Sequence, residues 1–539
     1  MMQKRIQTIL LILTLSVFFG IAIFYIFIKI TEMNRDKEVM AQSEILKAQY
    51  DKILDSASIS PTKLTIDYRK QISTGSPLIF GGAHMPYAGH DDAWDKIADS
   101  GVTMIRRDFF IEQILPENIT LEDYKNNVND VQNINNWNLG KDRYKEAKSR
   151  GLKVMGIIDY APSWLTFSGT PFGHIKDWGV YEDLVKKTYE VFRNDLDYLE
   201  IWNEPTFSHF NDTKNSSKSM EDAYIELAIH TIKAVREVDK KINDGKKTPL
   251  GGLVADNPKF AGDMLVRILQ EPKIIKELSF ISYHSYGHTE PSSELYKGIM
   301  QKYGYGNLPI FLTEWNYSSE EKIDNIHKTG NKAITYTANQ LFHFINQNIR
   351  GANYYMLEPV GFDSPGIGIK YMGFYRWENG QAILLPQART WRILSKQMGL
   401  GAGESRIYAT NIDSRSKIQE EKDSANITEV ALNAVGLSTE KEELNSIGFV
   451  NSNSEHGTAI VNSSQTDLVA EIEMKNTAIK KFARAKVFYA NAGNEAKTPV
   501  YEGLVKANGG KVKFNFYLPA ESVIGIKFEE EKQWYELFN

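Results

Sequence analysis

The chain contains no cysteine in 539 residues, which excludes disulfide bonds, thiolate nucleophiles and thiolate metal ligands. Its formal net charge is only −5 at pH 7, so no basic excess points to a nucleic-acid partner. The histidines show no metal-ligand spacing, and the sequence has no glycine loop of the kind that cradles phosphate. The sequence therefore predicts a protein that uses no metal or other cofactor and binds no nucleic acid.

Charge is also missing from one long stretch near the N-terminus. Residues 9–28 are uncharged and almost wholly apolar, and they follow Lys4 and Arg5. Twenty helical residues span about 30 Å, the thickness of the bilayer hydrocarbon. A cleavable signal has an apolar region of about 7–15 residues and a small-residue cleavage site, and residues 29–32 offer no such site. We therefore predict an uncleaved single-pass anchor in the cell membrane, with a signal peptide as the alternative.

This interpretation divides the chain into four parts. Residues 1–30 form a cytoplasmic tail and transmembrane anchor, and residues 31–60, which are charged and lack Gly and Pro, form a helical stalk. Everything beyond the anchor is expected to be extracytoplasmic. The two remaining parts, 61–400 and 401–539, differ in their hydrophobic patterns.

Between about residues 78 and 397, short apolar runs alternate with amphipathic helical patterns. The runs lie at 78–83, 103–107, 153–158, 198–202, 250–255, 280–283, 310–313 and 353–357. Eight strands with intervening helices predict an α/β domain, a (β/α)8 or TIM barrel, over residues 61–400. After about residue 401, short alternating runs separated by Asn, Gly and Ser predict an appended β-sandwich, to which residues 63–67 add a strand.

Two of the barrel strands end in a glutamate. Trp-Asn-Glu-Pro at 202–205 closes the fourth run, and Thr-Glu-Trp-Asn at 313–316 closes the seventh. Functional residues of such barrels lie at the C-terminal ends of the strands. Cleavage of a glycosidic bond needs two carboxyl groups across that bond, one protonated and one ionised. The pattern therefore predicts a glycosidase with Glu204 and Glu314 as its catalytic pair.

These segments, together with His-Ser-Tyr-Gly at 284–287, resemble family 39 of the glycoside hydrolases. That family contains retaining (β/α)8 enzymes, among them β-xylosidases, α-iduronidase and bacterial exopolysaccharide hydrolases. The resemblance covers about residues 78–395. It implies that Glu204 is the general acid/base and that Glu314 is the nucleophile, which forms a covalent glycosyl-enzyme intermediate. Retaining enzymes hold these two carboxyl groups about 5–5.5 Å apart.

The resemblance also implies substrate-binding and supporting roles around the pair. Asn203 matches an asparagine that hydrogen-bonds the sugar 2-hydroxyl. Arg106 matches an arginine that keeps the nucleophile ionised, with Arg107 as its rival by position. His284 and Tyr286 alternate onto one side of a strand end, and one of them, preferably Tyr286, is expected to hydrogen-bond the nucleophile. A core position is the alternative for His284.

Aromatic residues near the strand ends are candidate sugar platforms. Trp164 and Trp315 have this position, with core packing as the alternative for each. The eighth strand ends in Tyr-Tyr-Met-Leu-Glu at 354–358, where many relatives carry a tryptophan, and Trp377 on the following loop is a candidate substitute. Glu358 is a third strand-end carboxylate and a candidate substrate contact.

The sequence thus predicts a membrane-anchored retaining glycoside hydrolase that cleaves O-glycosidic bonds in a cell-surface or secreted polysaccharide. Its expected partners are a poly- or oligosaccharide substrate and the membrane. Two alternatives stay open at this point. One is an exo-acting glycosidase of the β-xylosidase type, and the other is a non-catalytic polysaccharide-binding or scaffold protein on the same barrel.

Overall fold

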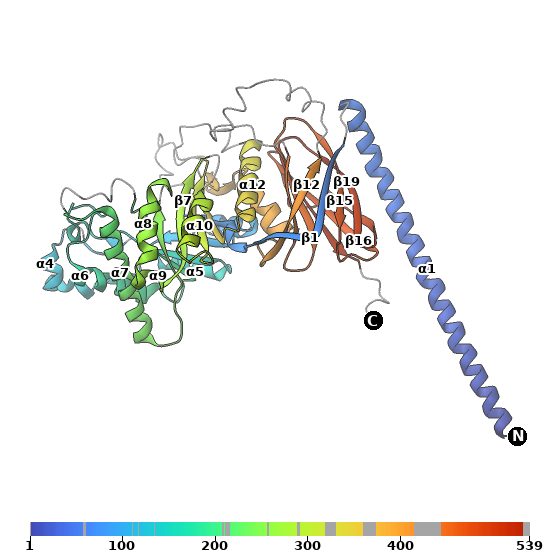
Figure 1. Ribbon diagram of the computed structural model, residues 1–539, viewed down its shortest axis with the longest axis horizontal. Coiled ribbons are helices and arrows are strands. Elements are labelled where there is room, and N and C mark those ends of the chain that lie inside the picture. Colours follow the sequence, from blue (N-terminus) through green and yellow to red (C-terminus); the bar gives the residue numbers. More distant parts are fainter. Residues whose placement is uncertain are drawn as a thin grey trace.

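The structure is a computed structural model with a long N-terminal helix, a closed parallel barrel and a β-sheet domain (Figure 1). It describes residues 2–57, 61–109, 111–116, 118–133, 135–206, 210, 216–255, 258–287, 292–317, 330–358, 373–413 and 444–531.

The barrel consists of eight parallel strands that close through the pairing of the first with the last. They are β2 (Gly81–Ala83), β3 (Met104–Asp108), β4 (Lys153–Ile158), β5 (Tyr198–Ile201), β6 (Leu250–Ala255), β7 (Leu278–Tyr286), β8 (Ile310–Asn316) and β9 (Gly351–Tyr354). The longer helices around them are α2 (Asp91–Ser100), α5 (Lys141–Ser149), α6 (Trp178–Phe192), α7 (Met220–Ile242), α8 (Pro258–Gln270), α10 (Ser292–Lys302) and α12 (Asn331–Asn346). Short helical segments complete the connections: η1 (Pro77–Phe80), α3 (Ile111–Ile114), α4 (Leu121–Lys125), α9 (Pro272–Ile275), α13 (Ala388–Trp391) and η6 (Arg392–Gln397). The predicted (β/α)8 barrel is confirmed.

Apolar side chains fill the interior of the barrel toward the N-terminal ends of its strands. Met104, Met155, Phe280 and Phe311 form a separate buried cluster there. Gly251 makes room for one of the two rings, since a Cβ on this glycine would lie 1.9 Å from the Phe280 ring. This packing leaves the C-terminal ends of the strands for polar and charged side chains.

The second domain is a ten-stranded sheet in the order β17-β16-β18-β19-β15-β1-β12-β13-β14-β20. Its strands are β1 (Thr62–Gly75), β12 (Ser405–Asp413), β13 (Leu444–Val450), β14 (His456–Asn462), β15 (Leu468–Lys475), β16 (Phe482–Asn491), β17 (Asn494–Glu495), β18 (Tyr501–Asn508), β19 (Lys511–Leu518) and β20 (Ser522–Glu530). An additional pairing of β16 with β20 folds the sheet back on itself around its own apolar core.

The barrel begins later in the chain than the predicted residue 61, because β1 belongs to the second domain. Strand β1 pairs with β15 and β12 in the second sheet, so the strand predicted at 63–67 is present there, whereas the barrel strands begin at Gly81. Its alternating burial explains this placement, because Leu64 and Ile66 point into the core of that sheet. Strands β12, β17 and β18 were not predicted. The alternating pattern of the sequence also predicts a strand at 427–432, and these residues lie outside the described ones.

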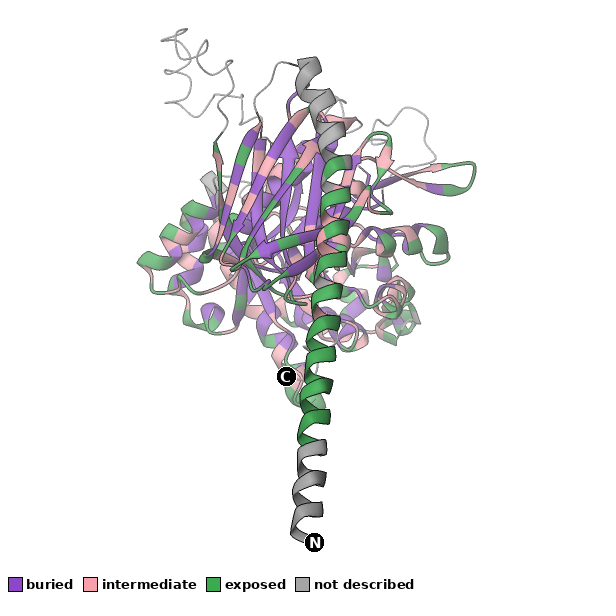
Figure 2. Ribbon diagram, turned by 90° about the vertical axis from the view of Figure 1, so that its right-hand side faces the viewer, coloured by how far each residue is buried: buried purple, intermediate pink, exposed green. Residues whose placement is uncertain are grey.

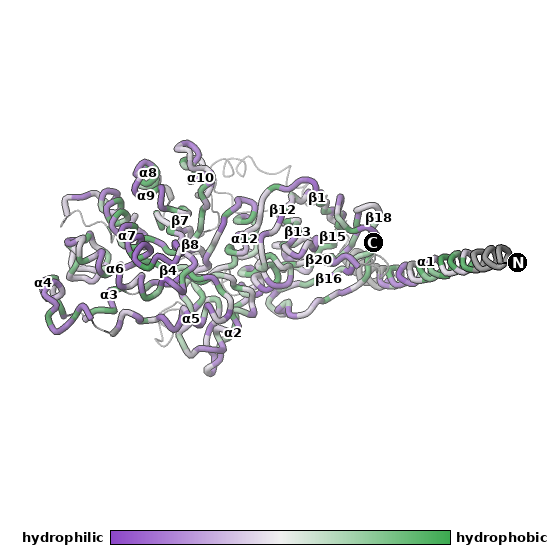
Figure 3. The backbone as a smooth tube through the Cα atoms, turned by 90° about the horizontal axis from the view of Figure 1, so that it is seen from below, coloured by the Kyte–Doolittle hydropathy of each residue, from purple (hydrophilic) through white to green (hydrophobic). Residues whose placement is uncertain are grey.

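Helix α1 (Met2–Ala57) is continuous and includes both the apolar segment and the predicted stalk. Its stretch Leu13–Gln42 is long and apolar enough to cross a membrane, and its most apolar window is not buried in the molecule. Figure 2 shows the middle of this helix largely exposed, and Figure 3 shows apolar residues along the coloured turns that lie nearest the N-terminus. Among the described residues, one helix, at the N-terminus, therefore has the length and composition of a membrane span.

Candidate active site

Glu204 and Glu314 meet at the C-terminal end of the barrel. Glu204 follows β5, the fourth barrel strand, and Glu314 lies in β8, the seventh. One oxygen of each carboxyl group and one nitrogen of His284 all lie within 4.8 Å of one another. Retaining glycosidases hold their carboxyl groups about 5–5.5 Å apart and inverting enzymes about 6.5–9.5 Å apart. The observed separation is that of a retaining pair.

A buried arginine holds Glu314 from one side. Arg106 donates from Nη1 to Glu314 Oε1 at 2.7 Å, from Nε to Glu200 Oε2 at 2.5 Å and from Nη2 to Asn203 Oδ1 at 3.0 Å. Burial opposes the charge of this guanidinium, but Glu200 and Glu314 more than compensate and raise the Arg106 pKa. Of the two rival arginines, Arg106 reaches Glu314, whereas Arg107 Nη1 lies 2.7 Å from His84 Nδ1.

Two residues of β7 occupy the other side of the pair. Tyr286 donates from its hydroxyl to Glu314 Oε2 at 2.6 Å. His284 Nδ1 lies 2.8 Å from Glu204 Oε1 and 3.6 Å from Glu314 Oε2. Burial of His284 favours the neutral ring, but Glu314 and Glu204 outweigh it and raise the His284 pKa. The histidine thus hydrogen-bonds Glu204 and also lies within ion-pair distance of Glu314.

The backbone that carries Glu204 is in an unusual conformation. Trp202 and Glu204 have φ angles of 66° and 47°, in the left-handed region that side chains other than glycine rarely adopt. Val254, whose carbonyl accepts a hydrogen bond from Glu204 N at 3.0 Å, also has a positive φ of 45°. Strained positions of this kind cluster at functional sites because the surrounding structure must hold them in place. Full burial of the Trp202 ring supplies such support.

Two residues of this network, Glu200 and Tyr160, were not predicted from the sequence. Glu200 is fully buried and pairs with Arg106 inside the barrel. Tyr160 accepts a hydrogen bond from Asn203 Nδ2 at 2.8 Å, so both polar groups of the Asn203 amide are engaged. Glu200 could have been predicted from the sequence, because it is an acidic residue within the apolar run 198–202 and a buried charge needs a partner. Tyr160 could have been predicted from its position two residues beyond the end of β4, since functional residues of such barrels lie at the C-terminal ends of the strands.

The three candidate tryptophans have different surroundings. Trp315 is 2% exposed and stacks on Trp391 with 5.8 Å between ring centroids, so its place is in the core. Trp164 is partly buried and stacks on Tyr124. Trp377 is also partly exposed and meets the His90 ring edge-on at 4.8 Å. Trp164 and Trp377 are therefore only partly covered, whereas Trp315 has the packing role that the sequence left open.

Glu358 belongs to a second polar group beside the site, where β9 and β2 end. Its carboxyl group is buried, its Oε1 lies 3.4 Å from His90 Nδ1, and burial raises its pKa. His84 lies on the loop after β2, as His90 does. Burial and the neighbouring Arg107 lower the pKa of His84 to about 4. These residues lie next to the strand that carries Glu314 in the barrel order, since β9 is between β8 and β2.

The atoms of Glu204, His284 and Glu314 converge closely enough that they could also hold a cation. Arg106 and Tyr286 already engage both oxygens of Glu314, however. A guanidinium in contact with the carboxylate supplies the positive charge that a metal would bring. The donor set therefore fits paired-carboxylate chemistry better than metal binding.

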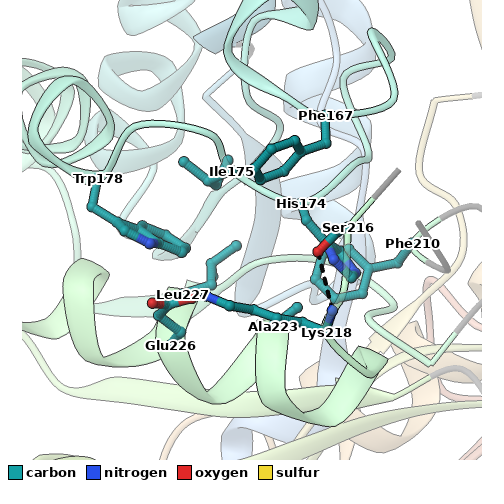
Figure 4. Close-up of a pocket in the computed structure, with 10 residues that line it drawn as sticks. All are labelled: Phe167, His174, Ile175, Trp178, Phe210, Ser216, Lys218, Ala223, Glu226 and Leu227. Carbon is teal, nitrogen blue, oxygen red and sulfur yellow. Dashed lines mark hydrogen bonds and ion pairs between the residues drawn. The ribbon is translucent and has the colours of Figure 1, made fainter. Parts of the chain in front are cut away.

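A small pocket lies beside the start of α7, and Phe210 of its lining also contacts the Trp202 ring. Figure 4 shows its wall formed by Phe167 and Trp178 on one side and Leu227 on the other, with Lys218 and Glu226 at its edge. Among the described residues, its lining does not include Glu204, Glu314 or the side chains that hydrogen-bond them.

The raised pKa of His284 gives a pH-dependent prediction. Its interaction with the two carboxylates is expected to stabilise the fold fully below about pH 6.5, the pKa of an unfolded histidine, and to weaken as pH rises through the higher folded pKa. His284→Gln should therefore lower the free energy of unfolding more at pH 6 than at pH 9. Urea unfolding of both proteins measures this, with His343→Gln on α12 as the control. An equal loss at both pH values would contradict the charged state.

A closed parallel barrel with two facing carboxylates at the ends of its fourth and seventh strands defines a retaining glycoside hydrolase. Within that class, the chain belongs to the cellulase family, glycosyl hydrolase family 5, whose family model matches residues 69–354. This family lies within the GH-A clan of retaining barrel enzymes. A comparison with curated protein sequences finds no match.

Solved structures show the same fold at low sequence identity. A glucosidase from Croceicoccus marinus is 13% identical with a TM-score of 0.59, and the match covers 88% of this chain and 100% of that one. A GH39 enzyme from Xanthomonas axonopodis pv. citri is 14% identical with a TM-score of 0.58, covering 88% and 98%. A family 30 subfamily 8 xylanase from Clostridium acetobutylicum is 12% identical with a TM-score of 0.57, covering 87% and 99%.

Proposed function

We propose that this enzyme cleaves O-glycosidic bonds of a cell-surface or secreted polysaccharide, with Glu314 as nucleophile and Glu204 as general acid/base. The observation that supports this assignment best is the asymmetry of the pair. Glu314 is 7% exposed and engaged at both oxygens by Arg106 and Tyr286, whereas Glu204 is more exposed and contacts His284. A nucleophile must stay ionised, and a cation in contact with a carboxylate favours that state.

The proposed reaction has two steps. Glu314 attacks the anomeric carbon, and Glu204 donates its proton to the departing glycosidic oxygen, which leaves a covalent glycosyl-enzyme ester. Water then attacks the same carbon, Glu204 takes the proton from that water, and Glu314 leaves as the carboxylate. Two inversions give a product with retained configuration.

The neighbouring residues suit binding of the sugar. Asn203 is adjacent to the acid/base, and its amide is held by Arg106 and Tyr160, so it is placed to contact the sugar 2-hydroxyl. On the nucleophile's side, the partly exposed Trp377 and the buried Glu358 are the proposed contacts to the sugar that becomes attached to Glu314. The motifs around Glu204, His284 and Glu314 also resemble those of family 39, although the family model that matches the chain is that of family 5.

Helix α1 is the proposed membrane anchor, with the barrel on the extracytoplasmic side, where polysaccharide is available. Its apolar stretch is long enough to span the hydrocarbon and its surface is exposed along that stretch. Fractionation of cells should place the intact chain in the membrane fraction, and protease added to intact cells, after removal of the wall, should digest the barrel. A mature N-terminus beyond Ile30 with the enzyme free in the medium would instead identify a signal peptide.

A polysaccharide panel tests the proposed activity directly. Wild-type enzyme should release oligosaccharides from at least one polymer, whereas Glu314→Gln should release none. Nuclear magnetic resonance of the first product formed should show the anomer of the substrate. Products of mixed length would indicate internal cleavage, and release of single sugars would indicate the exo-acting alternative. Binding without turnover by the wild-type protein on every polymer would favour the non-catalytic alternative.

A further inference from the structure

The polar part of α1 is fixed to the sheet domain by specific contacts. Gln42 Oε1 accepts a hydrogen bond from Leu504 N of β18 at 2.6 Å, and Lys506 Nζ lies 2.7 Å from Asp36 Oδ1. Strands β18 and β19 pair only beside the turn that joins them. The Leu504 amide lies beyond this pairing, so β19 does not provide its backbone hydrogen-bond partner. Gly503 leaves space for the helix, since a Cβ there would lie 2.5 Å from Gln42 Oε1.

These contacts also set the direction of β18 relative to the anchor. Gln42 meets Leu504 and Asp36 meets Lys506, so β18 runs back toward the apolar part of α1. Asp36 lies about 9 Å along the helix from Ile30, at 1.5 Å per residue. From Lys506 to Gly509, the strand continues about 10 Å in the same direction, at 3.3 Å per residue. The β18–β19 turn therefore reaches the level at which the apolar segment of α1 ends.

This end of the sheet domain carries many exposed cations. They come from the corner of β1, the segment between β15 and β16, and the β18–β19 hairpin: Arg69, Lys70, Lys475, Lys480, Lys506 and Lys511. Some of these cations already face acidic groups of the molecule: Lys506 pairs with Asp36, Lys511 pairs with Glu473, and Lys475 lies 4.0 Å from Glu473. Asn476 donates to Asp67, Glu530 accepts from the Lys480 amide, and Arg484 pairs with Glu531. Arg69, Lys70 and Lys480 add further positive charge at this end.

We propose that this end of the sheet domain, the β18–β19 turn with its surrounding lysines and arginine, lies in the lipid headgroup layer and binds anionic headgroups. Clustered cations next to a membrane span are attracted by the negative surface potential of anionic lipids. Docking at two points, the span and the basic end, would fix the orientation of the barrel above the membrane. The proposal rests on the anchor role of α1 proposed above.

The absence of native cysteine allows a direct test on the full-length chain. Asn508→Cys, next to the turn, and Gly493→Cys, at the opposite end of the sheet, would each carry a fluorophore in protein reconstituted into phosphatidylcholine vesicles containing phosphatidylglycerol. A quencher attached to the lipid headgroups should reduce the emission at position 508 several-fold more than at 493. Equal, weak quenching at both positions, in protein that floats with the vesicles, would overturn the docking but leave the anchor intact.

The role of the cations is tested by a second comparison. Replacing Lys475, Lys480 and Lys511 with glutamine in the Asn508→Cys protein should reduce the quenching, and so should vesicles of pure phosphatidylcholine. Unchanged quenching in both cases would overturn recognition of anionic headgroups. If the chain does not float with any vesicle, the anchor proposal itself fails, and this result is distinct from the other two.

Discussion

Replacing Glu314 with glutamine is expected to reduce turnover by at least on the order of 10⁴-fold, because the amide cannot form the covalent intermediate. The substitution keeps the shape of the side chain. Arg106 can still donate to the remaining carbonyl oxygen, so sugar affinity and fold should persist. Initial rates on a cleaved polysaccharide and on an aryl glycoside measure the loss, and thermal unfolding checks the fold.

Glu277→Gln is a matched control for that variant. Glu277 directly precedes β7, at the N-terminal end of the barrel, where it pairs with Arg236 and Lys247. The same chemical change there should leave turnover near the wild-type value. Substantial activity in Glu314→Gln would remove Glu314 from the role of nucleophile.

Glu204→Ala is expected to slow cleavage of natural glycosides by about 10²–10⁴-fold, the usual contribution of general acid/base catalysis. Substrates whose leaving group needs no proton should form the covalent intermediate at a nearly unchanged rate. Azide should then replace water as the second nucleophile, because it needs no general base. The measurement is the rate on activated and natural substrates with and without azide, together with identification of the glycosyl azide.

The same experiment contains its own control. Azide should not restore Glu314→Gln in this way, since no covalent intermediate forms there, and the azide product of Glu204→Ala should keep the substrate's anomeric configuration. Equal losses of Glu204→Ala on both kinds of substrate, without rescue by azide, would contradict the acid/base role.

The sequence alone determined the elements with strong local signals. The runs at 153–158 and 250–255 coincide with β4 and β6, because buried parallel strands are continuous apolar stretches bounded by polar turns. The run at 78–83 forms only a three-residue strand, β2. Ser76 and Pro77 begin a short helical turn, η1, in which the Ser76 hydroxyl accepts a hydrogen bond from Leu78 N. Glu204 and Glu314 could be predicted in the same way, because each lies at the end of such an apolar run.

Tertiary structure decided which side chains meet. Met104, Ile105 and Arg106 are all buried, so alternation along β3 could not say whether Arg106 or Arg107 enters the barrel. On β8, by contrast, neighbouring side chains point to opposite faces of the strand. Because Glu314 points into the barrel, Trp315 lies among the outer helices, where it contacts Phe344 of α12.

The place of β1 was also a matter of long-range pairing. A short alternating strand is compatible with either domain, and its partners β12 and β15 lie more than 300 residues away in the sequence. Local residue patterns determined which segments form strands and which strand ends carry carboxylates. The packing of distant segments determined their neighbours, because contacts between segments far apart in the chain depend on the whole fold rather than on any local pattern.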